Sequence, residues 1–190
     1  MTDAGPLPGL SQPRLTDEQL RSHRLATRLL LPLLVALAVI VVPLYLLYDN
    51  ARVTGTSMLP TLRNGDYLLI TRGWRTPARG DIIVVNVHNP DGTIDELVKR
   101  AVGLPGDTLA IRGDTASVNG RPEPYAETVV AAQTTEPVID TVVPTGTVFV
   151  LGDDRPVSDD SRHLGPLPMS DVHGRVIAIW GPIGRVRLVP

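Results

Sequence analysis

The chain has 190 residues, which is enough for one domain of ordinary size and a membrane anchor but too few for a second large domain. Its 18 basic and 20 acidic residues give a formal charge of -2, with no sign of the basic surface that nucleic-acid binding requires. Cysteine is absent from the sequence, which excludes disulfides, thiol nucleophiles and cysteine metal sites.

The N-terminal segment has two parts. Residues 1–14 are rich in proline and glycine, a composition that cannot bury enough apolar surface to fold, so we expect a disordered tail. Thr16 and Gln19 have capping-box spacing, which predicts a helix that begins near Asp17 and is rich in basic residues. We therefore assign residues 1–28 to a tail and a short basic helix.

Residues 29–48 carry no charge and are long enough, as a helix, to cross a hydrocarbon core of about 30 Å. The run is longer than the apolar region of a cleaved secretory signal and lacks a clean cleavage site, so we expect an uncleaved transmembrane helix. Four arginines precede it, and only Arg52 follows closely. The positive-inside rule then predicts a single-pass plasma-membrane protein with a cytoplasmic N-terminus and residues 49–190 outside.

Beyond residue 50, short β-branched runs alternate with Gly-Asp turns, and there is little sign of a helix. This pattern favours a mainly β domain, built as an antiparallel barrel or sandwich. Residues 113–146 depart from the rhythm, and we expect a poorly packed insertion of unassigned role. The expected strands lie at 67–70, 82–85, 108–111, 147–151 and 175–180, with a tight turn at Val118-Asn119-Gly120.

Two segments carry candidate chemistry. The segment from Gly55 to Leu62 places Ser57 within about 30 Å of the bilayer, although its small and turn-forming residues also suit an ordinary loop. Lys99 is the only lysine in the chain, against seventeen arginines. A lysine, unlike an arginine, can lose its proton among apolar neighbours and then activate a serine hydroxyl. The alternative is a solvated surface lysine.

A third segment, Gly152 to Arg162, contains four aspartates, two arginines and two serines. By composition alone this is typical of a solvated, charge-balanced turn. Its spacing does not fit an EF-hand calcium loop, and we expect no metal here.

Taken together, GTSMLPTL from Gly55, VKRAVGLPGD from Val98 and GDDRPVSDDSRHLG from Gly152 resemble the motifs of type I signal peptidases. These are membrane-bound Ser-Lys serine proteases that remove signal peptides from exported proteins. The resemblance runs from about residue 29 to the C-terminus, with an insertion as short as in Gram-positive members. It implies a β-barrel-like catalytic domain, cleavage after Ala-x-Ala sites, secretory preproteins and the lipid bilayer as partners, and no cofactor.

The resemblance also implies a role for particular residues. Ser57 is the nucleophile and Lys99 its general base. Ser158 orients the lysine amine, and an ion pair between Asp160 and Arg162 holds the site together.

For the oxyanion hole, the resemblance implies backbone N–H groups that include that of Ser57. Gly55 stands where some family members place a serine whose hydroxyl helps to bind the oxyanion. The substrate is expected to lie as an extended strand near Met58, Leu59, Leu97 and Val98.

The third segment departs from the family pattern at Pro156 and Val157, where Asp and Asn are commoner, and at Asp154, where Asn is commoner. We therefore assign no role to Asp153, Asp154 and Arg155.

Two other functions stay open. Ser57 could belong to a Ser-His-Asp hydrolase that uses His88, His163 or His173, in which case Lys99 would be dispensable. The chain could also be an inactive membrane-tethered β-domain that binds partners without chemistry.

Overall fold

The computed structural model describes residues 17–73, 76–132 and 137–189. The expected disordered tail and the capping residue Thr16 lie outside these residues. The chain divides into two compact units, one up to Leu44 and one from Tyr45 onward.

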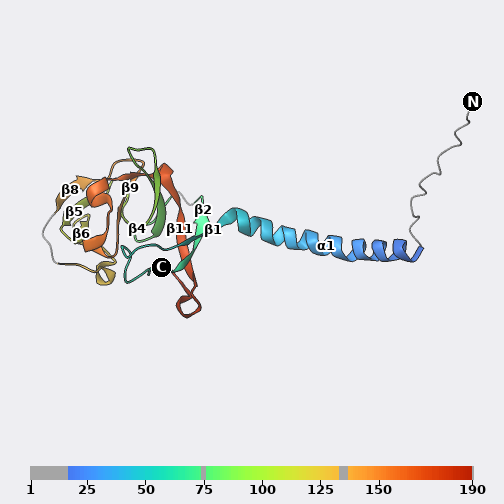
Figure 1. Ribbon diagram of the computed structural model, residues 1–190. Helices are drawn as coiled ribbons and strands as arrows, with labels where there is room; N and C mark the ends of the chain where they lie inside the picture. Colours follow the sequence, from blue (N-terminus) through green and yellow to red (C-terminus); the bar gives the residue numbers. More distant parts are fainter. Residues whose placement is uncertain (1–16, 74–75, 133–136, 190) are drawn as a thin grey trace, which may run out of the picture. The chain divides into compact units, whose positions relative to one another are not determined.

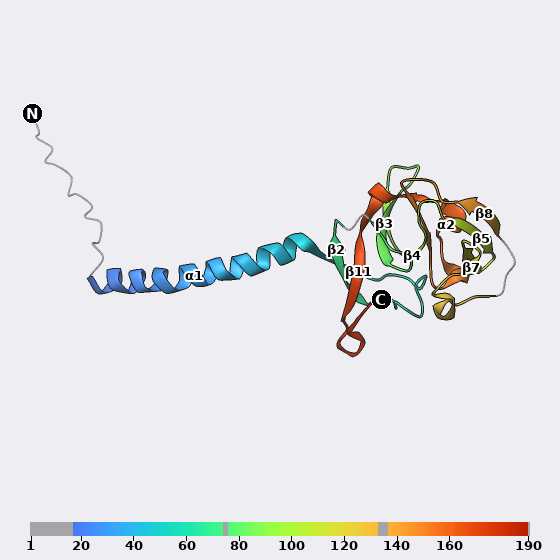
Figure 2. The same ribbon diagram turned by 180° about the vertical axis from the view of Figure 1, so that it is seen from behind.

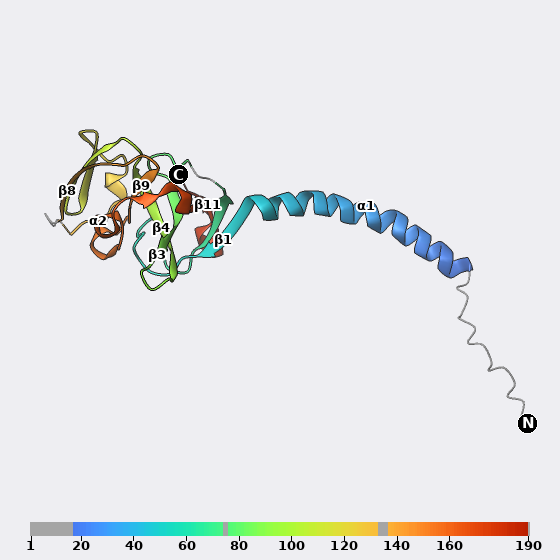
Figure 3. The same cartoon turned by 90° about the horizontal axis from the view of Figure 1, so that it is seen from above.

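The first long element is helix α1, Asp17–Leu47, which agrees with the predicted helix start and joins the basic and apolar segments into one helix (Figure 3). Within α1, Leu30–Leu47 is the one stretch of the described residues that is long and apolar enough to cross a membrane. None of its side chains is buried. Such an exposed apolar surface is typical of a helix surrounded by lipid.

The larger sheet of the second unit has the order β1-β2-β11-β3-β4-β9-β10, with β12 paired to β11, and all its pairs are antiparallel. Figure 2 labels four strands of this sheet, β2, β11, β3 and β4. The path does not close on itself, so the sheet is an open form of the expected barrel-like architecture. Its strands are β1 Tyr48–Arg52, β2 Tyr67–Arg72, β3 Ile82–His88, β4 Ile94–Gly103, β9 Thr147–Leu151, β10 Leu167–Pro168, β11 Val172–Gly181 and β12 Arg187–Leu188.

The smaller sheet takes three of its strands, β6, β7 and β8, from the insertion and has the order β7-β6-β5-β8 (Figure 1). Asn119 and Gly120 both have positive φ and form the predicted turn between β6 and β7. The expectation of poor packing is wrong, because Ala116 and Val118 are buried in a core with Leu109. The strands are β5 Thr108–Arg112, β6 Thr115–Val118, β7 Arg121–Pro122 and β8 Val138–Val142.

All five strands predicted from the sequence are present, as β2, β3, β5, β9 and β11. After residue 50 the described chain has only single-turn helices, in agreement with the sequence pattern. They are α2 Ser161–Leu164 and the 3-10 turns η1 Ala126–Thr128, η2 Arg155–Val157, η3 Met169–Asp171 and η4 Ile183–Arg185.

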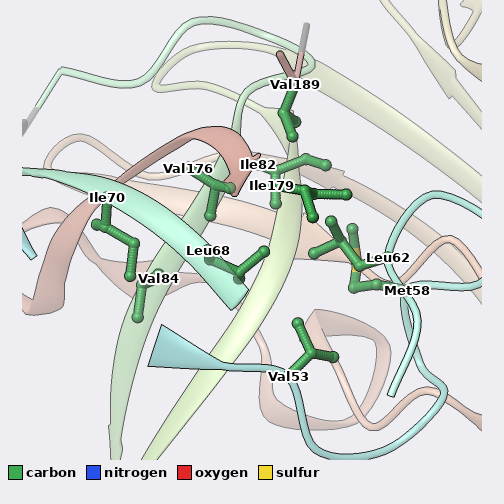
Figure 4. Packing of buried hydrophobic residues seen from close by; sticks show 10 residues of the cluster. All are labelled: Val53, Met58, Leu62, Leu68, Ile70, Ile82, Val84, Val176, Ile179 and Val189. Carbon is green, nitrogen blue, oxygen red and sulfur yellow. The ribbon is translucent and has the colours of Figure 1, made fainter. Parts of the chain in front are cut away.

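The main sheet is covered on both faces, which explains the continuous apolar run of β3. Ile82 and Val84 enter one core cluster, and Ile83 and Val85 enter another. Figure 4 shows the first cluster, which also contains Met58 and Leu62 from the loop that carries Ser57. Burying a side chain of this size stabilises a fold by about 1.5 to 3 kcal/mol. The Ser57 loop is therefore anchored in the core on its C-terminal side.

Candidate active site

The side chains of Ser57 and Lys99 meet. The Nζ of Lys99 donates a hydrogen bond of 2.8 Å to the Oγ of Ser57. Lys99 lies within β4, where it pairs with Ile83, and its exposed fraction is only 3%. Ser57 is half-buried on the loop after β1. This distance is short enough for direct proton transfer between the hydroxyl and the amine.

The surroundings of Lys99 favour its neutral form. Burial lowers the pKa of the Lys99 amine, while the charges of Asp160 and Asp159 oppose this change only in part. Within the described chain, no carboxylate forms an ion pair with the Lys99 ammonium. A lysine in such a site can serve as a general base.

Two hydrogen bonds hold the backbone of the loop at Ser57 and directly after it. The N–H of Leu62 donates to the carbonyl of Met58 at 2.8 Å, which forms a helical turn directly after Ser57. The carbonyl of Ser57 itself accepts a 2.9 Å hydrogen bond from the N–H of Asp154. The third motif, residues 152–162, thus fixes the peptide of the candidate nucleophile.

A groove of about 230 Å³ leads to the contact between Ser57 and Lys99, a pair that we call the dyad. One wall is formed by residues 51–55 with Ser57 and Met58, and the other by residues 96–99 of β4. Strand β1 is at the edge of its sheet, and β4 pairs with β9 only from Arg100 onward. The groove therefore lies between two strand segments that have free edges.

Most of the residues expected near the substrate are in this groove. Gly55, Met58, Leu97 and Val98 line it, but Leu59 does not.

The histidines do not join the dyad. In the described part of the chain, three histidines each lie near an aspartate, and none has a hydrogen bond to Ser57. The same part contains no cluster of three His, Cys, Asp or Glu that could hold a metal ion. The three histidine–aspartate pairs are His88 with Asp171 at 3.8 Å, His163 with Asp159 at 3.4 Å and His173 with Asp49 at 3.2 Å.

The family model described as signal peptidase, peptidase S26, matches residues 26–181. The chain belongs to this family. The signal peptidase I of Bacillus caldolyticus is 34% identical over 160 residues, which are 76% of this chain and 86% of that protein. The signal peptidase I of Bacillus licheniformis is 35% identical over 158 residues, 74% of this chain and 81% of that protein. A solved signal peptidase I from Enterococcus faecalis V583 is 34% identical and covers 53% of this chain and 96% of its own, with a TM-score of 0.42.

Family membership establishes the class of reaction. This member of the signal peptidase family is a serine endopeptidase that cleaves signal peptides. Its substrates are preproteins that carry such peptides.

In this signal peptidase the third motif packs directly against the dyad. A Cβ atom on Gly152 would lie 2.2 Å from the Oγ of Ser158 and 2.5 Å from the carbonyl oxygen of Ser57. Only glycine fits such a contact without displacing its neighbours. The sequence alone did not single out Gly152 as a site residue.

Of the two supporting interactions expected from the sequence, the structure contains the ion pair of Asp160 and Arg162 but not the hydrogen bond of Ser158 to Lys99. Arg162 Nε donates to Asp160 Oδ1 at 2.9 Å, and both side chains are buried, so the expected ion pair is present. Asp160 also accepts a hydrogen bond from the N–H of Gly152. Ser158 is buried too, but its Oγ has no hydrogen-bond partner among the described residues. The expected hydrogen bond between Ser158 and the Lys99 amine is therefore not formed in this structure.

Other buried ion pairs were not predicted, and two of them lie close to Ser57 and Lys99. Arg100, next to Lys99, donates to both carboxylate oxygens of Asp153 at 2.8 and 2.6 Å, and both side chains are fully buried. Arg155 pairs with Glu123 from the insertion in the same way. The third motif is thus a buried network rather than a solvated turn.

Proposed function

We propose that this signal peptidase hydrolyses the peptide bond with Ser57 as nucleophile and Lys99 as general base. Neutral Lys99 takes the hydroxyl proton while Ser57 Oγ attacks the scissile carbonyl carbon, and the resulting ammonium gives a proton to the leaving amine. Lys99 then deprotonates a water molecule that attacks the acyl carbon, and its ammonium returns the proton to Ser57 Oγ as the bond between that oxygen and the product breaks. The 2.8 Å contact between a buried lysine and a serine carries this proposal.

For the oxyanion we propose the backbone N–H of Ser57 as a principal donor. This N–H has no acceptor among the described hydrogen bonds, so it is free to bind a developing charge. Gly55 supplies no side-chain donor, and a Cβ placed there would meet no atom within 4 Å. Stabilisation of the oxyanion then depends on the main chain.

The groove suits an extended peptide. A substrate strand between the edge of β1 and the free half of β4 can form main-chain hydrogen bonds on both sides. Met58, Leu97 and Val98 line the groove beside Ser57 and Lys99 with apolar side chains, which suits small apolar residues at the cleavage site. We propose cleavage after Ala-x-Ala sequences on this basis.

We further propose that residues 29–48 anchor the enzyme in the plasma membrane as a single span. The exposed apolar surface of Leu30–Leu47 and the arginines that precede it support a cytoplasmic N-terminus and an extracytoplasmic protease domain, residues 49–190. Ser57 follows the end of α1 by ten residues, which keeps the site near the bilayer. A preprotein whose signal peptide is still in the lipid would present its cleavage site there.

The test is cleavage of a preprotein with an Ala-x-Ala junction by the full chain in detergent, with products identified by mass. Ser57→Ala and Lys99→Met should each lower kcat by about 10⁴-fold. His163→Ala, the matched control, should cut at the parent rate because His163 is exposed and pairs with Asp159. Loss of cutting in His163→Ala with a normal Lys99→Met would establish a histidine mechanism. A folded parent that cuts nothing would favour the non-catalytic β-domain.

A further inference from the structure

The insertion, residues 113–146, contacts the third motif through two buried ion pairs, Arg162 with Asp114 and Arg155 with Glu123, and the second is the shorter. Glu123 accepts two hydrogen bonds from Arg155 Nη2, at 2.6 and 2.7 Å, and the exposed fractions of the two side chains are 3% and 1%. Arg155 also donates to the carbonyls of Gly152 and Asp114. Glu123 therefore holds the guanidinium that fixes Gly152, the glycine packed against Ser57 and Ser158.

The main chain of the insertion makes a second contact with the third motif. The N–H of Val130 donates to the carbonyl of Asp153 at 2.8 Å, and the N–H of Arg155 donates to the carbonyl of Val130 at 3.0 Å. These two bonds flank the Asp154 residue whose N–H holds the carbonyl of Ser57. A shift of the insertion would thus move the Asp154 N–H that donates to the carbonyl of Ser57.

A third contact joins the insertion to Arg100, the neighbour of Lys99 in β4. The ring of Tyr125 lies over the Arg100 guanidinium, with the Arg100 Cζ 4.6 Å from the ring centroid, and it covers Gly80. Arg100 in turn donates to Asp153 and to the carbonyl of Gly80. Arg100 is the next residue of β4 after Lys99. Stacking of Tyr125 on Arg100 therefore fixes β4 next to Lys99.

We propose that Glu123 and Tyr125 are positioning residues for peptide-bond hydrolysis. Glu123 holds the third motif through Arg155, and Tyr125 holds β4 through Arg100. Ser57 and Lys99 thereby stay in contact, and Lys99 stays shielded from water. Neither residue touches the reacting atoms. This inference rests on the proposed dyad, and it gives the insertion a role that its sequence did not indicate.

The experiment compares Glu123→Gln, Tyr125→Ala and Tyr125→Phe with the parent, all as the full chain in detergent. Asp140→Asn is the matched control, because it removes a carboxylate of the insertion that pairs with Arg112 on the exposed surface. Glu123→Gln and Tyr125→Ala should lower kcat by about tenfold or more with KM within twofold of the parent, because the dyad is displaced in the bound complex. Tyr125→Phe, which keeps the ring over Arg100, should restore kcat, and Asp140→Asn should match the parent.

The pH profile separates positioning from a loss of folded protein. If the third motif loosens in Glu123→Gln, water reaches Lys99, its pKa rises, and the acidic limb of kcat/KM moves to higher pH. Assays run well below the melting temperature of each variant keep the folded fraction equal. A Glu123→Gln enzyme with the parent kcat and the parent acidic limb would overturn the proposal. So would a loss of activity that disappears once the folded fraction is matched. Failure of the dyad itself would appear separately, as full activity in Lys99→Met.

Discussion

The Lys99 amine and the Ser57 hydroxyl lie 2.8 Å apart although 42 residues separate them in the chain. The neighbouring residue of the same strand, Arg100, forms a buried ion pair with Asp153. In the proposed mechanism these two adjacent basic residues have opposite requirements, because Lys99 must lose its charge to act as a base and Arg100 must keep its charge to pair with Asp153. Lysine and arginine differ in this property, so exchanging either for the other should impair the site.

The buried Lys99 should make the fold less stable at neutral pH than at alkaline pH. Burial lowers the pKa of Lys99 below its ordinary value of 10.5, so between the two pKa values the unfolded chain binds more protons than the folded one. Stability therefore rises with pH through this window. Lys99→Met should raise the melting temperature at pH 7, by about 2 to 4 °C for each kcal/mol gained, and should flatten this pH dependence. A lower melting temperature in Lys99→Met would show instead that the ammonium stabilises the fold.

Gly152→Ala should damage the site more than a methyl group usually does. The added Cβ would collide with Ser158 Oγ and with the carbonyl of Ser57, which is held by Asp154. We expect a loss of about 1 to 3 kcal/mol in the free energy of unfolding and a fall in kcat of about 100-fold. Gly184→Ala is the control, since nothing lies within 4 Å of its Cβ position. Equal effects of the two substitutions in denaturation and cleavage assays would contradict the packing described for Gly152.

Ser158→Ala should separate activity from stability. The Ser158 Oγ is buried and has no hydrogen-bond partner in the described residues, so its removal should leave the free energy of unfolding unchanged or raise it by up to about 1 kcal/mol. If Ser158 orients the Lys99 amine during the reaction, kcat should still fall by about 10- to 100-fold. Urea denaturation and cleavage rates measure the two effects. Parent kcat in Ser158→Ala would remove Ser158 from the proposed mechanism.

The ion pair of Asp66 and Arg185 should support the fold except at strongly acidic pH. Burial alone would raise the pKa of Asp66, but hydrogen bonds from Arg185 and from the N–H of Arg63 outweigh it and hold this pKa below its ordinary value of 3.8. The stabilisation is present above pH 3.8 and is lost as pH falls through the lowered pKa.

Arg185→Gln should therefore cost about 1 to 3 kcal/mol at pH 7, because Asp66 is almost fully buried. The difference from the parent in urea denaturation should shrink in acid below the lowered pKa. A difference that is the same at both pH values would mean that Arg185 acts by packing alone.

The sequence predicted the strands that are marked by short apolar runs, whether these are buried throughout, as in β9, or alternate with more exposed positions, as in β2 and β5. It did not delimit β1 or β4. Strand β4 breaks the apolar pattern because its first half lines the groove with Glu96 and its second half carries Lys99 and Arg100. Strand β1, YDNAR, is polar because it is an edge strand. The polar and charged residues that line the groove thus made β1 and β4 hard to recognise as strands in the sequence.

The buried ion pairs were also beyond prediction from the sequence. Charged residues are usually solvated, and the partners of Arg100 and Arg155 lie 53 and 32 residues away. The prolines around Glu123 suggested a loose insertion, whereas burial of Arg155 required that segment to pack. By contrast, the contact between Ser57 and Lys99 could be expected, because an ordered set of motifs and a single lysine mark the two residues.

Lys99 is not only buried at the dyad but is also the one lysine side chain in the whole sequence. Growth on isotopically labelled lysine would therefore place a single labelled ε-amine in the entire enzyme. Its resonance would report the protonation of the proposed base directly, free of overlap and without any substitution.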